Sequence, residues 1–312
     1  MAWLVLSGLA LLPACSQPSA PAPPASPRPD LVLVSIDTLR ADRLSLFGNE
    51  QPTSPRLEEL AVGAWVFGQA ISPAPWTLPS VTSTLTGLSP AEHGVVDRGL
   101  ELASEVETLA ETLSGLGYQT AFFGVNAAFV TGHGLDQGFE TWQASTGLSG
   151  GQLNRQVQRF LETGRDGRPL LLVVHYFEPH CPYQAPRPLR ARFLPTEGPA
   201  TPLSLERYEL MGDCFDLQHQ DGSPELDQRV YRARYEQEVL AVDQLVGELW
   251  AMVEPASPWF GVVADHGEAF WEHGVHGHGD QLYQEQVRVP MLLRPPAPQA
   301  GVVDTPAMDS PV

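Results

Sequence analysis

Leu31-Val32-Leu33-Val34-Ser35-Ile36 is an almost unbroken aliphatic run, and Asp37 follows it directly. Such a run is typical of a strand that is buried on both faces in a parallel sheet. Similar apolar runs lie at residues 120–124, 169–176, 259–264 and 289–293, and helical patterns fall between them at 54–64, 103–116, 152–163 and 226–253. Because strands and helices alternate, the sequence predicts an α/β domain with a mostly parallel central sheet.

The composition limits the classes of function. A chain of 312 residues with 43% hydrophobic content is long enough to bury one sizeable core. The formal net charge is -19, and all 18 basic residues are arginines. We therefore expect no nucleic-acid partner, since binding to a phosphate backbone needs a basic face. The absence of lysine also means that no lysine can serve in an active site.

The N-terminus has the pattern of an export signal. Residues 1–12 are mostly apolar, too short to span a bilayer, and Pro13-Ala14-Cys15 follow. The pattern is similar to a bacterial lipoprotein signal, which predicts a signal peptide over 1–15, a lipid anchor on Cys15, and an exported protein held in the cell envelope or periplasm. An ordinary secretory signal or a misassigned start codon are the alternatives. The Pro/Ala-rich residues 16–29 predict an extended linker, which leaves 30–312 as the main domain.

Two further cysteines, Cys181 and Cys214, fit either a disulfide in an exported protein or two free thiols. The region 181–223 is rich in proline, arginine and glycine and has no sustained period. We expect a long loop there, of the kind that often carries binding residues.

Candidate site residues stand where buried strands end. In open α/β sheets, ligands bind beyond the carboxyl ends of the strands. Asp37 follows the first strand, and Asp265-His266 follow the strand at 259–264. A single aspartate at such a place is usually a turn former or a helix cap. Two carboxylates and an imidazole at two strand ends instead favour a divalent cation, without which buried acids are costly.

Hydroxyl and imidazole groups add to this set. Thr77 stands in Pro75-Trp76-Thr77-Leu78-Pro79-Ser80, at the start of a helix predicted to run to residue 88, where backbone N–H groups favour anions. His266, His273, His276 and His278 lie in a glycine-rich loop, and His175 and His180 follow another strand. Each of these side chains alone has an ordinary structural explanation: a helix cap for Thr77, and a solvated surface position for the histidines.

The order of these motifs resembles the sulfatase-like family of the alkaline phosphatase superfamily. The similarity covers nearly the whole chain after the linker. The segments that carry it are Val34-Ser35-Ile36-Asp37-Thr38-Leu39-Arg40, Ala74-Pro75-Trp76-Thr77-Leu78-Pro79-Ser80, Leu85-Thr86-Gly87-Leu88, His93-Gly94-Val95, Gly117-Tyr118, His175-Tyr176-Phe177-Glu178-Pro179-His180, Asp265-His266-Gly267-Glu268 and Tyr283-Gln284-Glu285-Gln286-Val287-Arg288-Val289-Pro290.

The resemblance implies a three-layer sandwich of the alkaline phosphatase type and an ester hydrolase. It implies that Asp37, Asp265 and His266 bind the metal and that Thr77 is the metal-activated nucleophile. It further implies that His180 and His278 hold the non-bridging oxygens or protonate the leaving group. These roles agree with the chemistry, because a metal favours the alkoxide and neutralises the developing charge.

Several departures bear on the substrate. Sulfatases carry Cys or Ser, oxidised to formylglycine, where this chain has Thr77, and threonine cannot yield that aldehyde. Their Gly-Lys-Trp-His signature is replaced by Gly124-Val125-Asn126-Ala127, and His278 stands where many have lysine. We therefore expect phosphate mono- or diesters first, sulfate esters as the alternative, and a non-catalytic binding protein as the further alternative. Small-molecule, glycan or lipid esters are the expected substrates.

The metal is expected to be a single divalent ion. An imidazole ligand favours manganese or zinc, with calcium as the alternative. A two-metal phosphatase needs an acid with a histidine four residues on, whereas Asp243 has Gly247 at that spacing. Chains of this family usually continue into a small antiparallel subdomain, and the end at Val312 predicts that this subdomain is largely missing.

Overall fold

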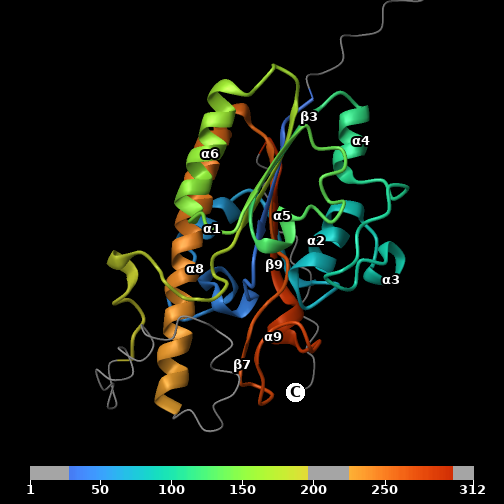
Figure 1. Ribbon diagram of the computed structural model, residues 1–312. Coiled ribbons are helices and arrows are strands. Elements are labelled where there is room, and N and C mark those ends of the chain that lie inside the picture. Colours follow the sequence, from blue (N-terminus) through green and yellow to red (C-terminus); the bar gives the residue numbers. More distant parts are fainter. Residues whose placement is uncertain (1–27, 196–224, 298–312) are drawn as a thin grey trace, which may run out of the picture.

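A seven-stranded sheet organises the chain (Figure 1). The computed structural model describes residues 28–195 and 225–297. The strand order is β2-β9-β6-β1-β5-β3-β4. The strands are β1 (Leu31–Ile36), β2 (Trp65–Ile71), β3 (Gln119–Val125), β4 (Thr141–Ser145), β5 (Leu170–Tyr176), β6 (Trp259–Ala264) and β9 (Arg288–Arg294).

The expected mostly parallel sheet is confirmed. β1 lies between β5 and β6, and β3 lies between β5 and β4, with every one of these pairs parallel. β9 is antiparallel to both β6 and β2. The sequence did not predict β2 and β4, which are the two edge strands.

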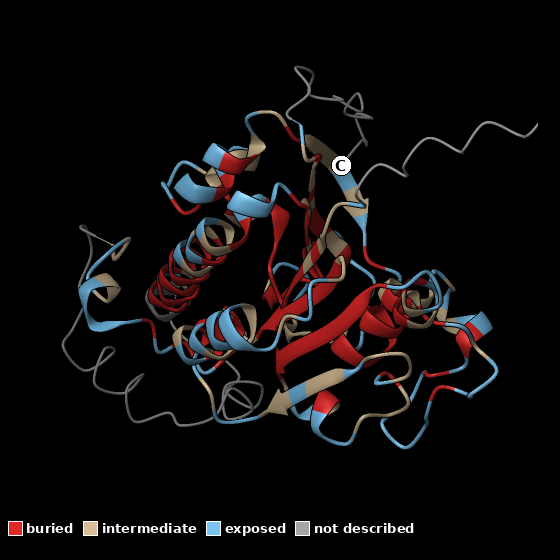
Figure 2. Cartoon of the chain, turned by 90° about the horizontal axis from the view of Figure 1, so that it is seen from above, coloured by how far each residue is buried: buried red, intermediate tan, exposed pale blue. Residues whose placement is uncertain are grey.

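Helices cover both faces of the sheet and complete three layers (Figures 1 and 2). One face carries α1 (Pro55–Ala61), α6 (Gly150–Thr163) and α8 (Glu225–Val253), and the other carries α2 (Thr77–Thr86), α3 (Pro90–His93), α4 (Leu109–Gly115) and α5 (Ala127–Val130). Shorter elements are β7 (Ala269–Phe270), β8 (His276–Gly277), α9 (Gln284–Val287) and the 3-10 turns Ala41–Arg43, Ser45–Phe47, Arg187–Leu189 and Glu254–Ala256.

The apolar run of β5 is continuous because the strand is buried on both faces. All seven of its residues are buried. Leu172 and Val174 pack into the core under α1, α6 and α8, whereas Leu171 and Val173 pack into the core under α2 and α4. Each such side chain contributes roughly 1.5–3 kcal/mol by burial, so both layers of helices depend on the central strands.

The helix ends differ most from those predicted where a capping residue sets the boundary. The helix expected over 103–116 begins at Leu109, because Thr108 and Glu111 form a reciprocal capping box. The helix that starts at Thr77 ends at Thr86, since Gly87 takes a left-handed conformation with a φ of 72°. The helices expected over 54–64, 152–163 and 226–253 are α1, α6 and α8 with small changes at their ends.

Several predictions fall on residues beyond those described. The signal peptide with Cys15, nearly all of the linker, most of the 181–223 loop with Cys214, and the last fifteen residues lie outside the described ranges. Cys181 is disulfide-bonded, which agrees with one of the two expectations for this cysteine. Across residues 28–195 and 225–297, no helix combines the length and the apolar character needed to cross a membrane.

Candidate active site

Asp37 and Asp265 lie side by side because their strands are neighbours. β1 and β6 pair in parallel with Ile36 opposite Ala264, so the residue after each strand leaves the sheet at the same edge. The Asp265 N–H donates to the carbonyl of Ile36 at 3.2 Å. Both carboxylates are almost fully buried, at 0% and 1% exposure. The sheet itself therefore brings two acids together out of contact with water.

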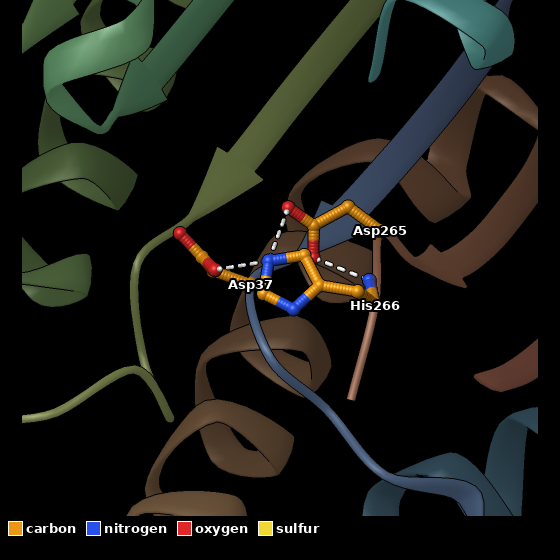
Figure 3. A group of neighbouring side chains, drawn as sticks. All are labelled: Asp37, Asp265 and His266. Atoms are coloured by element: carbon orange, nitrogen blue, oxygen red, sulfur yellow. Dashed lines mark hydrogen bonds and ion pairs between the residues drawn. The ribbon is translucent and has the colours of Figure 1, made fainter. Parts of the chain in front are cut away.

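The imidazole of His266 completes a buried group with the two acids (Figure 3). Its Nε2 lies 3.4 Å from Asp37 Oδ1 and 3.6 Å from Asp265 Oδ2. Its Nδ1 lies 2.9 Å from the Gly267 carbonyl oxygen. A carbonyl can only accept, so Nδ1 carries the proton and Nε2 presents its lone pair to the acids.

These three residues fit a divalent metal. Asp37 Oδ1 and Asp265 Oδ2 are buried atoms without a hydrogen-bond partner. Together with the imidazole, the ligand atoms lie within 4.8 Å of one another. Leaving buried carboxylate oxygens unpaired is costly, and two oxygens with one neutral imidazole suit a divalent cation. Within the described ranges, this is the one group of three or more acids, histidines or cysteines with that spacing.

The protonation of the group follows from its burial. Burial and the adjacent charge of Asp37 raise the pKa of Asp265 well above its ordinary value. Burial also raises the pKa of Asp37, but the imidazoles of His180, His175 and His266 outweigh it and hold that pKa well below the usual range. Burial and the neighbouring His278 lower the pKa of His266 to about 3, so this imidazole is neutral at physiological pH.

α8 holds the turn that carries Asp37. The Tyr235 hydroxyl accepts from the Arg40 N–H at 2.9 Å and donates to the Thr38 carbonyl at 2.8 Å. Thr38 has a φ of 54°, which is rare for a β-branched residue. The Thr38 N–H in turn donates to Asp265 Oδ1 at 3.2 Å. The strained turn is thus stabilised from both sides and joins the two acidic positions.

Thr77 lies at the first turn of α2, beside the buried group of Asp37, Asp265 and His266. Its Oγ1 lies 3.3 Å from His266 Nε2, and the residue is 7% exposed. α2 and β6 are tied together close by, because the hydroxyls of Ser72 and Ser80 both donate to the Asp265 carbonyl oxygen. The backbone fixes the distance between the hydroxyl of Thr77 and the acids.

His180 and His278 approach the same group from two loops. The ring centroid of His278 lies 4.4 Å from that of His266 and 5.1 Å from that of His180. His180 is stacked on Phe177, and its Nδ1 lies 2.6 Å from the Cys181 carbonyl oxygen. All six residues expected in the site, namely Asp37, Thr77, His180, Asp265, His266 and His278, are therefore brought together.

Comparison with known proteins identifies the family. The family described as Sulfatase matches residues 29–309. The chain belongs to the sulfatase family.

Relatives and solved structures agree with this assignment. An ulvan-active sulfatase of Formosa agariphila is 24% identical over 321 residues, which cover 91% of this chain and 60% of that protein. This sulfatase-family chain therefore spans about three fifths of that relative. The phosphonate monoester hydrolase of Agrobacterium radiobacter has the same fold, with a TM-score of 0.69 and 20% identity over 86% of this chain and 68% of that one. So does the C-terminal periplasmic domain of EcEptC from Escherichia coli in complex with Zn, with a TM-score of 0.65 and 18% identity over 87% of this chain and 74% of that one.

His278 pairs with the carboxylate of Glu268, and the contact shifts the pKa of both groups. Its Nδ1 lies 3.1 Å from Glu268 Oε1. Burial lowers the pKa of His278, but the Glu268 carboxylate outweighs burial and the net pKa is raised. In the same way, burial raises the pKa of Glu268, while His278 brings it below its ordinary value.

Sequence reasoning missed Asn126 as a partner of the site. Its Nδ2 donates to Asp37 Oδ2 at 2.7 Å, and its Oδ1 accepts from the Ala128 N–H and caps α5. His175, a candidate from the sequence, lies on the same side, with Nε2 3.5 Å from Asp37 Oδ2. Both contacts leave Oδ1 of Asp37 facing His266. Asn126 directly follows β3, so the rule that selected Asp37 would also have found it.

Other residues singled out in the sequence lie outside the group. His93 bonds to Ser83 and to the Val95 N–H, and His273 pairs with Glu285. Asp243 accepts from the Arg56 and Leu57 N–H groups at 2.9 and 2.8 Å. This acid therefore caps α1. The number of metal ions bound stays a prediction.

Proposed function

We propose that this chain is a metal-dependent ester hydrolase in which Thr77 is the nucleophile. The observation that supports this most directly is the position of Thr77 Oγ1, 3.3 Å from His266 Nε2 and beside two buried acids with unpaired oxygens. Asp37, Asp265 and His266 would hold a divalent ion, which when bound would favour the alkoxide and neutralise charge on the reacting ester.

The side chains of this chain then divide the reaction between them. Thr77 loses its hydroxyl proton to water and attacks the central phosphorus through Oγ1, the bond to the alcohol oxygen breaks, and the leaving alkoxide takes up a proton. His180 and His278 hold the non-bridging oxygens or supply that proton. Thr77 stands at the N-terminus of α2, where the helix dipole favours negative charge. Water then attacks the enzyme ester and releases Thr77.

Phosphate mono- and diesters are the favoured substrates. Threonine cannot be converted to the formylglycine aldehyde that sulfatases use, and the chain has no lysine. The imidazole ligand favours manganese or zinc over calcium. The phosphonate monoester hydrolase and the zinc complex of the periplasmic EcEptC domain support phosphorus chemistry and zinc on this fold. Sulfate esters are the second candidate, supported by the ulvan-active sulfatase.

The setting of the activity is also part of the proposal. Cys15 would carry a lipid anchor that holds an exported protein at the cell envelope or in the periplasm. Small-molecule, glycan or lipid esters are then the accessible substrates, and nucleic acid is not expected because the net charge is -19.

The test compares ester classes on metal-loaded protein. Chromogenic phosphate monoester, phosphate diester, phosphonate and sulfate esters are offered to the manganese- and zinc-loaded forms of the wild type, Thr77→Ala and Thr77→Ser. We expect phosphoester turnover that falls by roughly 10³-fold or more in Thr77→Ala and partly survives in Thr77→Ser. An unchanged rate in Thr77→Ala rules out the nucleophile. Faster sulfate-ester turnover favours a sulfatase, and failure to bind either metal favours a non-catalytic binding protein.

A further inference from the structure

The β7–β8 hairpin places a buried carboxylate against one of the site histidines. We infer that Glu268 is a positioning residue, which acts through His278 by fixing the orientation of its ring towards the substrate. This inference rests on the proposed function, in which His278 contacts the reacting ester. Glu268 would not contact the ester itself, so the proposed reaction does not by itself call for it.

The register of the hairpin sets the pair. β7 and β8 are antiparallel, with Phe270 opposite His276 and Ala269 opposite Gly277. Glu268 directly precedes β7 and His278 directly follows β8, so the same register continued by one residue would set them opposite each other. Side chains directly opposite each other across an antiparallel pair are close enough to interact, and Glu268 Oε1 lies 3.1 Å from His278 Nδ1.

The hydrogen bond determines which nitrogen faces the site. An ionised carboxylate can only accept, so Nδ1 donates to Glu268 and Nε2 is left to face away from it. The Glu268 side chain is 1% exposed and that of His278 is 20% exposed. One edge of the imidazole is therefore held inside the protein while the ring stays accessible next to His266 and His180.

The backbone around Glu268 has little freedom to move. Arg40 Nη1 donates to the Glu268 carbonyl oxygen at 2.9 Å and to Glu272 Oε1 at 2.7 Å. The Gly267 N–H donates to the Gln286 carbonyl at 2.7 Å. A Cβ at Gly267 would meet the Glu285 carbonyl oxygen at 2.1 Å. The position of the carboxylate is thus set by the fold, and the orientation of His278 follows from it.

A matched pair stands in the same loop. His273 Nδ1 lies 2.6 Å from Glu285 Oε1, and Glu285 is also buried, at 7% side-chain exposure. The His273 ring is stacked on Tyr283, and 45% of its side chain is exposed. Glu285 therefore provides a control with the same chemistry and a similar degree of burial.

The experiment is a double-mutant cycle on metal-loaded protein. We expect Glu268→Ala to lower kcat by roughly 10–100-fold, as is typical for residues that orient a functional histidine, with KM little changed and metal content equal to that of the wild type. Glu268→Gln keeps an acceptor oxygen and should recover much of the rate. Glu268→Ala combined with His278→Ala should be no slower than His278→Ala alone. Glu285→Ala should retain the wild-type kcat.

A second readout does not depend on turnover. In nitrogen-15 spectra of histidine-labelled protein, the His278 Nδ1 proton bonded to Glu268 should be visible in the wild type and in Glu285→Ala, and lost in Glu268→Ala. Unchanged His278 signals in Glu268→Ala, or multiplicative losses of rate in the double variant, overturn the inference. If the spectra behave as expected but the wild type hydrolyses no ester, the proposed function fails while the positioning of His278 stands.

Discussion

Replacing Glu238 with glutamine should remove a large pH dependence from the free energy of unfolding. Glu238 lies on α8 and is 4% exposed. Burial, and to a lesser extent the charge of Glu178, raise the pKa of Glu238 from 4.5 to about 8. The Gln184 N–H and Arg190 act in the opposite direction. Glu178 lies two residues before His180, in the loop after β5, so this pair of acids includes a neighbour of a proposed catalytic residue.

The sign follows from where each state keeps the proton. Between pH 4.5 and about 8, the unfolded chain has lost the proton of Glu238 and the folded chain still holds it. The stabilising effect is therefore complete below pH 4.5 and is lost as the pH rises through about 8. At about 1.4 kcal/mol per pH unit, this range corresponds to about 5 kcal/mol of unfolding free energy.

Urea unfolding of the metal-free protein at several pH values between 5 and 9 measures this effect. The wild type should lose stability with rising pH, whereas Glu238→Gln should be much flatter, because its amide is neutral throughout. Glu162→Gln, on an exposed position of α6, is the control and should follow the wild type. If the wild type and Glu238→Gln differ by a constant at every pH, the reasoning is wrong.

Three further changes test the frame of the site. Asn126→Ser keeps a side chain that can cap α5 but loses the donor to Asp37, so metal affinity should fall roughly 10–100-fold in a metal titration while the melting temperature is nearly unchanged. An equal affinity would show that the contact is dispensable. Asp243→Ala removes both acceptors at the start of α1 and should cost about 1–3 kcal/mol in urea unfolding; no loss would contradict the capping role. Gly267→Ala forces a Cβ to within 2.1 Å of the Glu285 carbonyl oxygen, and we expect a loss of roughly 1–3 kcal/mol or more together with lower metal occupancy. Full stability in this variant would show that the loop can yield.

The central strands and the clustering of Asp37, Asp265 and His266 were predictable from the sequence. β5 is buried on both faces and β1 and β6 are largely so, which is why their apolar runs are continuous. Asp37 and Asp265 could be placed together because parallel neighbouring strands end at the same edge. This reasoning needs only local pattern and a general rule of sheet topology.

The edge strands and the side-chain partners of the site were harder to predict from the sequence. β2 is at most partly buried, and its pairing with β9 is irregular between Phe67 and Ala70. β4 is also only partly buried. Neither strand carries the apolar run that marks a central strand. The strand-end rule could have selected Asn126 as a site residue, but not its contact with Asp37, 89 positions away. The hairpin register that pairs Glu268 with His278 depends on tertiary packing.

The hydroxyls of Ser72 and Ser80 share one carbonyl acceptor, that of Asp265. The segment before α2, the first turn of α2 and the end of β6 are thereby joined at a single atom, and none of these bonds involves the side chain at position 77. Exchange of that side chain leaves the joint intact. Under the proposed function, the nucleophile could therefore be exchanged by one substitution while Asp37, Asp265 and His266 keep their positions.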